Sequence, residues 1–379
     1  MTDRLDVTGL QDPTMRVRAG LLERALLRGT TVSEALDQAD RMWRFVRDGS
    51  GSPAGEAVGV AYYRDAGCWS WIDADGRIFV PDSGYFDRHP IWGGIRSVKV
   101  DGQHMVEIPA FYYRRTRDGD DFEVWVSPSP APGFELHPAF KQDGRPLQTV
   151  CLGAYEANWD VDTAGSQPNC EPLTNVSFEQ AQVYATRYGG PEGFGLWSIY
   201  ELAAVQMLML IELGTPDVQS AIGMGNVRSR GPKPTGTTAA AWRGLHELWG
   251  NVWQMVDGLR HDAEGRIEVW DADGHRRWIN TGLKAADLNR IGYIDSFRCE
   301  RGDGWDLGAL FVPGSLAEDP EDAMVSDLSI GPDYGRASVT YHGGNWANAA
   351  GAGVFTLNLS NVRSGSSSNI GFRPAFRNP

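Results

Sequence analysis

Apolar residues recur at helical spacing in the first fifty residues of the chain. The segments DPTMRVRAGLLERALLRG and TTVSEALDQADRMWRFVRDG each place them on one face and end at a glycine. The second segment opens with Thr31 and Glu34, the two polar residues of a capping box. A stretch rich in Gly, Ser and Pro follows at 48–57. The pattern predicts a separate helical segment over residues 1–52.

From about residue 61 the pattern changes to apolar residues that alternate with polar ones. Three alternating segments are interrupted by an Asp-Gly pair, at 75–76, 101–102 and 273–274. Such a pair favours a tight hairpin turn, because the turn residues need positive φ. The runs FEVWVSPSP and TVCLGAYEA predict further strands. We therefore expect twisted antiparallel strands in this part of the chain.

Two helices are predicted among the strands. SFEQAQVYATRYGG begins with the capping-box pair Ser177 and Gln180, and SIYELAAVQMLMLIELG begins with Ser198 and Glu201. Each segment ends at a glycine. The second is apolar nearly all round, so we expect it to be buried against a sheet.

Long loops are predicted at 223–240 and over most of 296–335, where Gly, Pro and polar residues are frequent. The chain shows no fixed-period repeat. Together these patterns predict an α+β domain over residues 53–379, with antiparallel strands, two main helices and long loops.

The composition argues against several classes of protein. With 41% hydrophobic and 22% charged residues, the chain of 379 residues can bury a large core. Its formal net charge of -14 argues against a nucleic-acid partner, which normally needs a basic face. The apolar run LAAVQMLMLIELG is too short to span a bilayer, so no transmembrane segment is expected. The N-terminus lacks the apolar region of a signal peptide.

Segments that resemble catalytic or metal-binding motifs are each incomplete. HELWG has Gly250 where a zinc-binding helix needs its second histidine. The GMG at 223–225 lacks both the preceding strand and the further glycine of a dinucleotide-binding loop. Two DADG stretches lack the closing glutamate of an EF-hand loop, and a hairpin turn explains both. The sequence therefore predicts no metal site.

Histidines and cysteines are scattered along the chain. A lone histidine is more often a structural group than a base or a ligand, and the sequence has no G-x-S-x-G motif. Without a C-x-x-C pair, we expect free buried thiols at Cys68, Cys151, Cys170 and Cys299. No catalytic residue is predicted.

Two motifs carry a resemblance to a known family. WRGLHELWGNVWQMVDG at 242–258 resembles the G-L-x-E/D-x-x-G-N-V-W-E-W signature of the formylglycine-generating-enzyme branch of the C-type lectin fold. G-G-N-W, L-N-x-x-N and S-x-x-N-I-G-F-R-P-A over 343–376 are similar to the variable region of diversity-generating-retroelement target proteins, which include phage major tropism determinants. Segment 104–156 resembles segments of phage-associated proteins of this type. The likeness covers most of 60–379 and implies a C-type lectin-like fold.

The sequence departs from the enzymes of this branch at two places. Those enzymes use a pair of cysteines shortly after G-G-S-W, whereas the interval from Asn345 to Phe376 contains no cysteine. The thiolate is the nucleophile and metal ligand in such chemistry, so its loss disfavours an enzyme. Relatives that bind calcium near N-V-W-E-W use the glutamate, and Gln254 stands there in this sequence. No cofactor is expected, and calcium is the one alternative kept open.

The segment VFTLNLSNV alternates between apolar and polar residues. Its apolar residues should face the core and its polar residues the solvent, as in a half-buried strand. NIGFRPAF predicts a second strand, which Pro374 should end or place at a sheet edge. The residues expected to form the fixed scaffold are Trp346, Phe355, Leu357, Leu359, Ile370 and Phe372, with Trp249, Asn251 and Trp253 from the upstream motif.

The resemblance implies that polar positions between these anchors vary. In the family, varied residues are encoded by adenine-containing codons, typically AAC, whose randomisation yields many small and polar residues. Within the expected variable region at about 340–376, the matching ligand-binding positions are Asn345, Ala347, Asn348, Gly351, Thr356, Asn358, Ser360, Asn361, Ser364, Gly365, Ser367 and Ser368.

The sequence thus predicts a ligand-binding, receptor-recognition protein and not an enzyme. The expected ligand is a macromolecule, first of all a protein. We expect the protein in the cytoplasm or on a virion, as part of a phage tail. Two alternatives stay open. One is an oxidase of the formylglycine-generating kind, and the other is a structural phage tail component without a diversified site.

Overall fold

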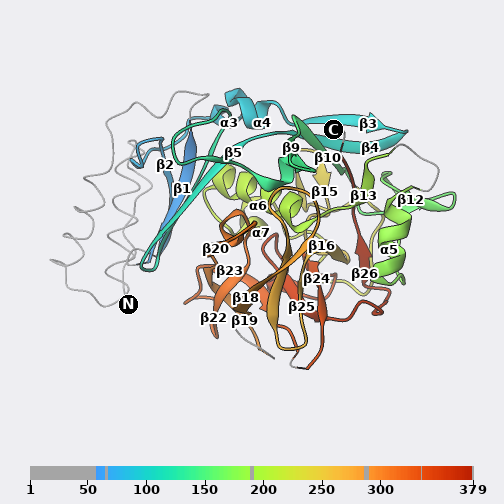
Figure 1. The fold of residues 1–379 in the computed structure, drawn as a ribbon. Coiled ribbons are helices and arrows are strands. Elements are labelled where there is room, and N and C mark those ends of the chain that lie inside the picture. The colour runs from blue at the N-terminus through green and yellow to red at the C-terminus, as the bar shows by residue number, and fades with distance from the viewer. Residues whose placement is uncertain (1–56, 65–66, 188–191, 286–289, 334, 378–379) are drawn as a thin grey trace, which may run out of the picture.

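The computed structural model describes residues 57–64, 67–187, 192–285, 290–333 and 335–377. Within these ranges the protein is mostly β with few helices (Figure 1). The predicted helical segment at 1–52 lies outside them. No helix in the described ranges is both long enough and apolar enough to cross a membrane.

Most of the strands belong to three sheets in the described part of the chain (Figure 1). The first sheet is antiparallel, in the order β2 (Cys68–Ile72), β1 (Val58–Tyr63), β6 (Asp121–Ser127), β5 (Tyr112–Asp118) and β7 (Glu135–Leu136). The second is also antiparallel, in the order β13 (Phe194–Leu196), β27 (Pro374–Phe376), β10 (Thr149–Gly153), β4 (Gln103–Pro109) and β3 (Arg96–Val100). The third is mixed, in the order β18 (Trp278–Lys284), β17 (Arg266–Trp270), β16 (Trp253–His261), β24 (Ser338–His342), β25 (Leu357–Asn361), β23 (Val325–Ile330), β19 (Ile291–Phe297) and β22 (Pro313–Ala317), with β26 (Ile370–Phe372) parallel to β16.

The remaining elements are short. Two-stranded ribbons pair β8 (Lys141–Gln142) with β9 (Arg145–Pro146), β11 (Asn158–Asp160) with β12 (Thr163–Gly165), β14 (Ala241–Trp242) with β15 (Leu245–His246), and β20 (Arg301–Gly302) with β21 (Trp305–Asp306). The helices are α3 (Tyr85–Arg88), α4 (Pro90–Gly93), α5 (Phe178–Ala185), α6 (Ile199–Leu213) and α7 (Val218–Ala221), with 3₁₀ turns η1 (Pro138–Phe140), η2 (Leu307–Ala309) and η3 (Ala349–Gly351).

Helix α6 forms the centre of the core. Its residues from Ile199 to Ile211 are all buried, and it contacts β1, β6 and β16 between the first and third sheets (Figure 1). The Ser198 and Glu201 side chains each accept a backbone N–H of the other residue, as a capping box requires. Gly214 ends the helix at φ 63, a left-handed conformation that favours glycine. The predictions of this helix, its ends and its burial are confirmed.

Helix α5 starts at its predicted capping box, Ser177 with Gln180, but it ends at Ala185. The predicted stop at Gly189 lies outside the described residues. Arg187 already adopts φ 50, and its guanidinium forms ion pairs with Asp160 and Asp101 at 2.9 and 3.0 Å. The helix therefore ends earlier than its pattern indicates.

The three Asp-Gly pairs differ in the turns that they form. At 101–102 both residues have positive φ, and Val100 pairs with Gln103 in a two-residue hairpin, as predicted. At 273–274 the hairpin forms, but residues 271–277 separate the paired Trp270 and Trp278. At 75–76 the turn is followed by a single bridge between Ile72 and Ile78, so the predicted second strand is wrong.

Of the two predicted loops, one is confirmed and the other is wrong. Residues 223–240 form a loop, as expected. The segment 296–335 instead contains β20 to β23 and η2, so its prediction as mostly loop is wrong. The alternation in MVSDLSI marks β23, where Val325, Asp327 and Ser329 are buried and the residues between them are half-buried.

The C-terminal segment serves two sheets in succession. After β26 pairs with β16, the chain leaves the third sheet at Arg373 and enters the second as β27. β27 lies between β13 and β10, so the prediction of an edge position for Pro374 is wrong. The prediction that the chain leaves its first ladder near Pro374 is confirmed.

Candidate functional site

The predicted site lies on the stretch 343–369, which runs from β24 through β25 to β26. Hydrogen bonds between main-chain atoms hold its first half. The Ser229 N–H donates to Trp346 O at 2.8 Å, and the Ala349 N–H donates to Val227 O at 2.9 Å. These bonds use no side chain, so they can persist when side chains in this loop are exchanged.

The second half of the stretch is held in the same way. The Asn175 N–H donates to Ser367 O at 3.1 Å, and the Phe178 N–H donates to Arg363 O at 3.0 Å. The Arg363 guanidinium also reaches Glu179 at 2.7 Å and lies over the Phe178 ring, 5.0 Å from its centroid. Arg363 was not predicted as a site or scaffold residue, and its contacts make it a fixed anchor beside the predicted variable positions.

The predicted scaffold residues are mostly buried. Their exposed fractions are 9% or less at Trp249, Asn251, Trp253, Phe355, Leu357, Leu359, Ile370 and Phe372. Trp346 differs, because it is only half-buried. Its side chain is not part of the buried core, contrary to its prediction as an apolar scaffold residue, and only its main chain holds the loop.

The predicted solvent-facing position of Thr356 is wrong. Thr356 is fully buried, and its hydroxyl donates to Gly351 O at 2.8 Å. The alternation of VFTLNLSNV begins only at Leu357, because residues 353–356 form a turn in which the Thr356 N–H bonds Gly353 O. Side chains in a turn do not follow the two-residue period of a strand.

Asn345 is also buried, with 7% of its surface exposed. Its side-chain oxygen accepts the Ala347 N–H at 2.8 Å, which closes a local turn of the kind that asparagine favours. The residue therefore shapes the loop and presents little surface to a ligand, contrary to its prediction as a binding position.

The other ten predicted positions reach the surface. Ala347, Ser364 and Ser368 are exposed, and the half-buried ones are Asn348, Gly351, Asn358, Ser360, Asn361, Gly365 and Ser367. Within the described ranges, their side-chain hydrogen bonds stay inside the segment. Asn348 accepts the Asn345 N–H at 2.8 Å, and Asn358 accepts the Ser360 hydroxyl at 2.9 Å. These side chains do not hold the segment to the rest of the protein.

An apolar stripe, which we define as Ile291, Tyr293, Leu328 and Ile330, adjoins these positions. Ile330 pairs with Asn358 across β23 and β25, and with Ile291 across β23 and β19, so their side chains share one face. Tyr293 pairs with Leu328 on the same face. Ile291 is 63% exposed. Sequence reasoning missed the stripe, because β23 was expected to be a loop.

The stripe connects the two halves of the site. A Cβ atom on Gly351 would lie 3.2 Å from the Leu328 side chain, which places the first loop against the stripe. Asn358 lies beside Tyr341 of β24, whose hydroxyl would lie 3.4 Å from a Cβ atom on Gly365. The ten surface positions and the stripe thus form one surface, which we call the β25 surface.

The two motifs that carry the family resemblance meet behind this surface, at Arg373. Its fully buried guanidinium donates to Gly153 O at 2.7 Å, to His246 O at 2.5 Å and to the Gln254 side-chain oxygen at 3.0 Å. Burial lowers the pKa of Arg373 to about 10, which still leaves it charged at neutral pH. The Gln254 amide donates to Glu247 O at 2.6 Å, so both ends of this side chain are used within the fold.

Asn251 of the same motif ties three segments together. Its amide donates to Glu156 at 2.6 Å, and its oxygen accepts the Lys233 N–H at 2.8 Å and the Asn226 amide at 2.9 Å. Burial and the neighbouring Glu247 carboxylate raise the pKa of Glu156 well above its usual value. This network fixes the loop 226–233, and residues 227 and 229 of that loop hold the first half of the site.

The described part of the chain offers no candidate metal centre. It holds no cluster of three or more His, Cys, Asp or Glu side chains placed to bind a metal ion. The four thiols are free, as predicted, but Cys170 and Cys299 are half-buried, whereas Cys68 and Cys151 are buried. The β25 surface itself offers hydroxyl, amide and apolar groups, which suit recognition by contact.

Comparison with known proteins gives structural matches only. No family model matches the chain, and no curated protein matches it. Similar solved structures include Treponema denticola variable protein 1, with 14% identity over 75% of this chain and 99% of that one, at a TM-score of 0.35. PvdO from Pseudomonas aeruginosa is 12% identical over 75% of this chain and 98% of its own, at 0.32. The Major Tropism Determinant P3c variant is 10% identical over 86% of this chain and 73% of its own, at 0.30.

Proposed function

We propose that this protein recognises a macromolecular ligand, a protein in the first place, through the β25 surface on a C-type lectin-like scaffold. In this proposal the ten surface positions are diversified by a retroelement through adenine mutagenesis. One observation carries it. Main-chain hydrogen bonds hold both halves of the site, while the side chains at these positions bond, among the residues that the structure describes, only within the segment. Such an arrangement allows side chains to be exchanged without loss of the frame.

The β25 surface combines a fixed part with an exchangeable part. The stripe supplies apolar area at constant positions, and apolar contact of this kind forms the centre of most interfaces. The exchangeable positions here carry small residues such as Ala347, Ser360 and Ser368. Large anchors such as Tyr, Trp and Arg usually dominate binding energy, so this copy should bind weakly compared with copies that carry them.

The sequence favours recognition over oxidation at this site. No cysteine lies between Asn345 and Phe376. The Gln254 side chain already accepts a hydrogen bond from Arg373 and donates one to Glu247 O. Conversion of a sulfatase cysteine to formylglycine by the purified protein, followed by mass spectrometry, would refute the binding role in favour of the enzyme. A structural phage tail role would share the scaffold but would gain nothing from exchangeable positions.

Two matched libraries test the proposal. Randomising Asn358, Ser360 and Ser368 together should leave most clones folded, with unfolding free energies within about 1 kcal/mol of the parent, because side chains that reach the surface tolerate exchange. Randomising Leu357, Leu359 and Ile370 should cost most clones about 2–5 kcal/mol through lost packing. Chemical denaturation of random clones from each library measures both.

The same libraries show whether the surface binds ligands or merely tolerates substitutions. Selection against a panel of proteins should yield binders from the surface library, and substitutions in the stripe, such as Leu328→Asp, should weaken them. If the surface library unfolds as often as the buried one, the proposed site is wrong.

A further inference from the structure

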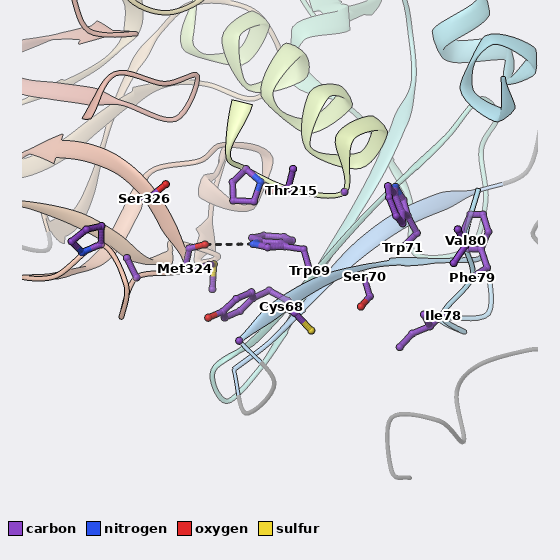
Figure 2. A pocket seen from close by; sticks show the side chains of 16 residues that line it. Cys68, Trp69, Ser70, Trp71, Ile78, Phe79, Val80, Thr215, Met324 and Ser326 are labelled. Carbon is purple, nitrogen blue, oxygen red and sulfur yellow. Dashed lines mark hydrogen bonds between the residues drawn. The ribbon is translucent and has the colours of Figure 1, made fainter. Parts of the chain in front are cut away.

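A cavity of about 420 Å³ lies away from the ten exchangeable positions, between β2, the end of α6 and the segment 320–326 (Figure 2). Its volume falls in the range of sites that hold small organic ligands, roughly 300–1,000 Å³. Ser326 lines the cavity and lies two residues before Leu328 on the same face of β23. The cavity therefore lies next to the end of the apolar stripe on β23.

Two tryptophans of β2 form the main wall. Trp69 and Trp71 are two residues apart, so they share a face of the strand, and Figure 2 shows both on the side of Thr215. The Trp69 indole N–H donates to Met324 O at 3.4 Å, and the Trp71 indole N–H donates to Ile211 O at 2.7 Å. These bonds use the polar edge of each indole and fix its orientation, which leaves apolar ring surface for the cavity.

The end of α6 is built closely against one of these rings. A Cβ atom on Gly214 would lie 2.3 Å from the Trp71 ring, and Gly214 has φ 63. A side chain there would displace the indole. The ring of Trp69 packs against that of Tyr62, another lining residue, with ring centroids 5.3 Å apart. The wall is therefore set in place before any ligand arrives, which lowers the cost of binding.

The charges around the cavity select against anions. Among the described residues, no charged side chain lines it. Pro320 of its rim is flanked by the exposed carboxylates of Asp319 and Glu321, and Asp322 follows. The neighbouring Arg64 is paired with Asp295 at 2.7 Å. With a net charge of -14 on the chain, an anion would meet repulsion on its approach.

We propose that this cavity binds a flat aromatic molecule without negative charge, about the size of two fused rings. The fixed indoles offer ring-to-ring contact, which aromatic pairs prefer in offset or edge arrangements. Apart from Tyr62, the lining side chains with a hydroxyl group are small, namely Ser70, Thr215 and Ser326. A sugar, which presents many hydroxyls, would leave most of them without a partner.

The test uses the full chain and three ligands that share one ring system. Indole is neutral, tryptamine is a cation at neutral pH, and indole-3-acetate is an anion. Titration calorimetry, with saturation-transfer NMR for weak binding, should detect indole and tryptamine and show at least tenfold weaker binding of indole-3-acetate. Ser326→Trp, which fills the cavity, should abolish binding, and Trp159→Ala, which removes a 53% exposed indole outside the lining, should not.

Three results would overturn the proposal. In the first, neither indole nor tryptamine binds. In the second, all three ligands bind equally well. In the third, a folded Ser326→Trp protein binds as well as the parent. Thermal denaturation shows whether that variant folds, and Thr215→Trp fills the same cavity from the segment that follows α6 if it does not. Binding at the β25 surface is measured with protein ligands, so failure here leaves the proposed function untouched.

Discussion

Replacing Arg373 with methionine is expected to lower the free energy of unfolding by about 3–5 kcal/mol, because several buried hydrogen-bond acceptors lose their donor at once. The guanidinium is fully buried and satisfies oxygens of Gly153, His246, Glu247 and Gln254. Methionine fills similar space but donates no hydrogen bond, so these acceptors would be left in the core without a donor. Urea denaturation of both proteins measures the loss.

Two variants make this result specific. Arg373→Lys keeps the charge but cannot reach all the acceptors from one ammonium group, so it should lose an intermediate amount. Arg336→Met removes an exposed pair with Asp333 and should change stability by less than about 1 kcal/mol. If Arg373→Met and Arg336→Met unfold at the same urea concentration, Arg373 does not join the two motifs as we describe.

The second large effect is a pH dependence of stability caused by Asp327. Burial raises the pKa of this carboxyl from 3.8 to about 7. It outweighs the hydrogen bond that the carboxylate accepts from the Phe355 N–H at 2.7 Å, which by itself lowers the pKa. Its protonated form is thus favoured in the folded state. The protonated carboxyl contributes its full stabilisation below about pH 4, and this contribution is lost as the pH rises through about 7. The free energy of unfolding then falls by roughly 4 kcal/mol, at 1.36 kcal/mol per pKa unit.

Asp327→Asn should remove this dependence, because the amide is neutral at every pH and its oxygen can still accept the Phe355 N–H. Buried groups such as Glu156 and His342 also titrate, so the quantity to follow is the stability of the parent minus that of the variant. This difference should fall by several kcal/mol between pH 4 and pH 7.5. The matched variant Asp303→Asn, at an exposed position, should change the free energy of unfolding by less than about 0.5 kcal/mol. A flat difference between the parent and Asp327→Asn across this pH range would refute the assignment.

Local signals predicted much of the frame. The capping boxes at Ser177 and Ser198 placed the starts of α5 and α6, because capping depends on residues three positions apart. The Asp101–Gly102 turn was also predictable from neighbouring residues alone, since both residues must adopt positive φ. At 75–76 the same pair did not make a full hairpin, because pairing beyond the turn depends on strands far away in sequence.

The site itself was predicted only in part. The period of two is valid within a strand, and it failed at Thr356 because the strand begins one residue later. The stripe was missed because it arises from the pairing of β19, β23 and β25, and the parallel contact of β23 with β25 has no local signal. The motif containing Arg373 was recognised by resemblance, whereas its partner Gln254 follows only from the packing of distant segments.

The central claim is that the positions of the β25 surface are exchanged while the frame is kept. Sequencing the genomic locus tests this most directly. We predict a nearby repeat that matches codons 340–376 except at adenines, beside a reverse transcriptase gene, with the differences at codons of the ten surface positions. Absence of any such repeat, or differences at the codons of Phe355, Leu357 and Leu359, would contradict the account.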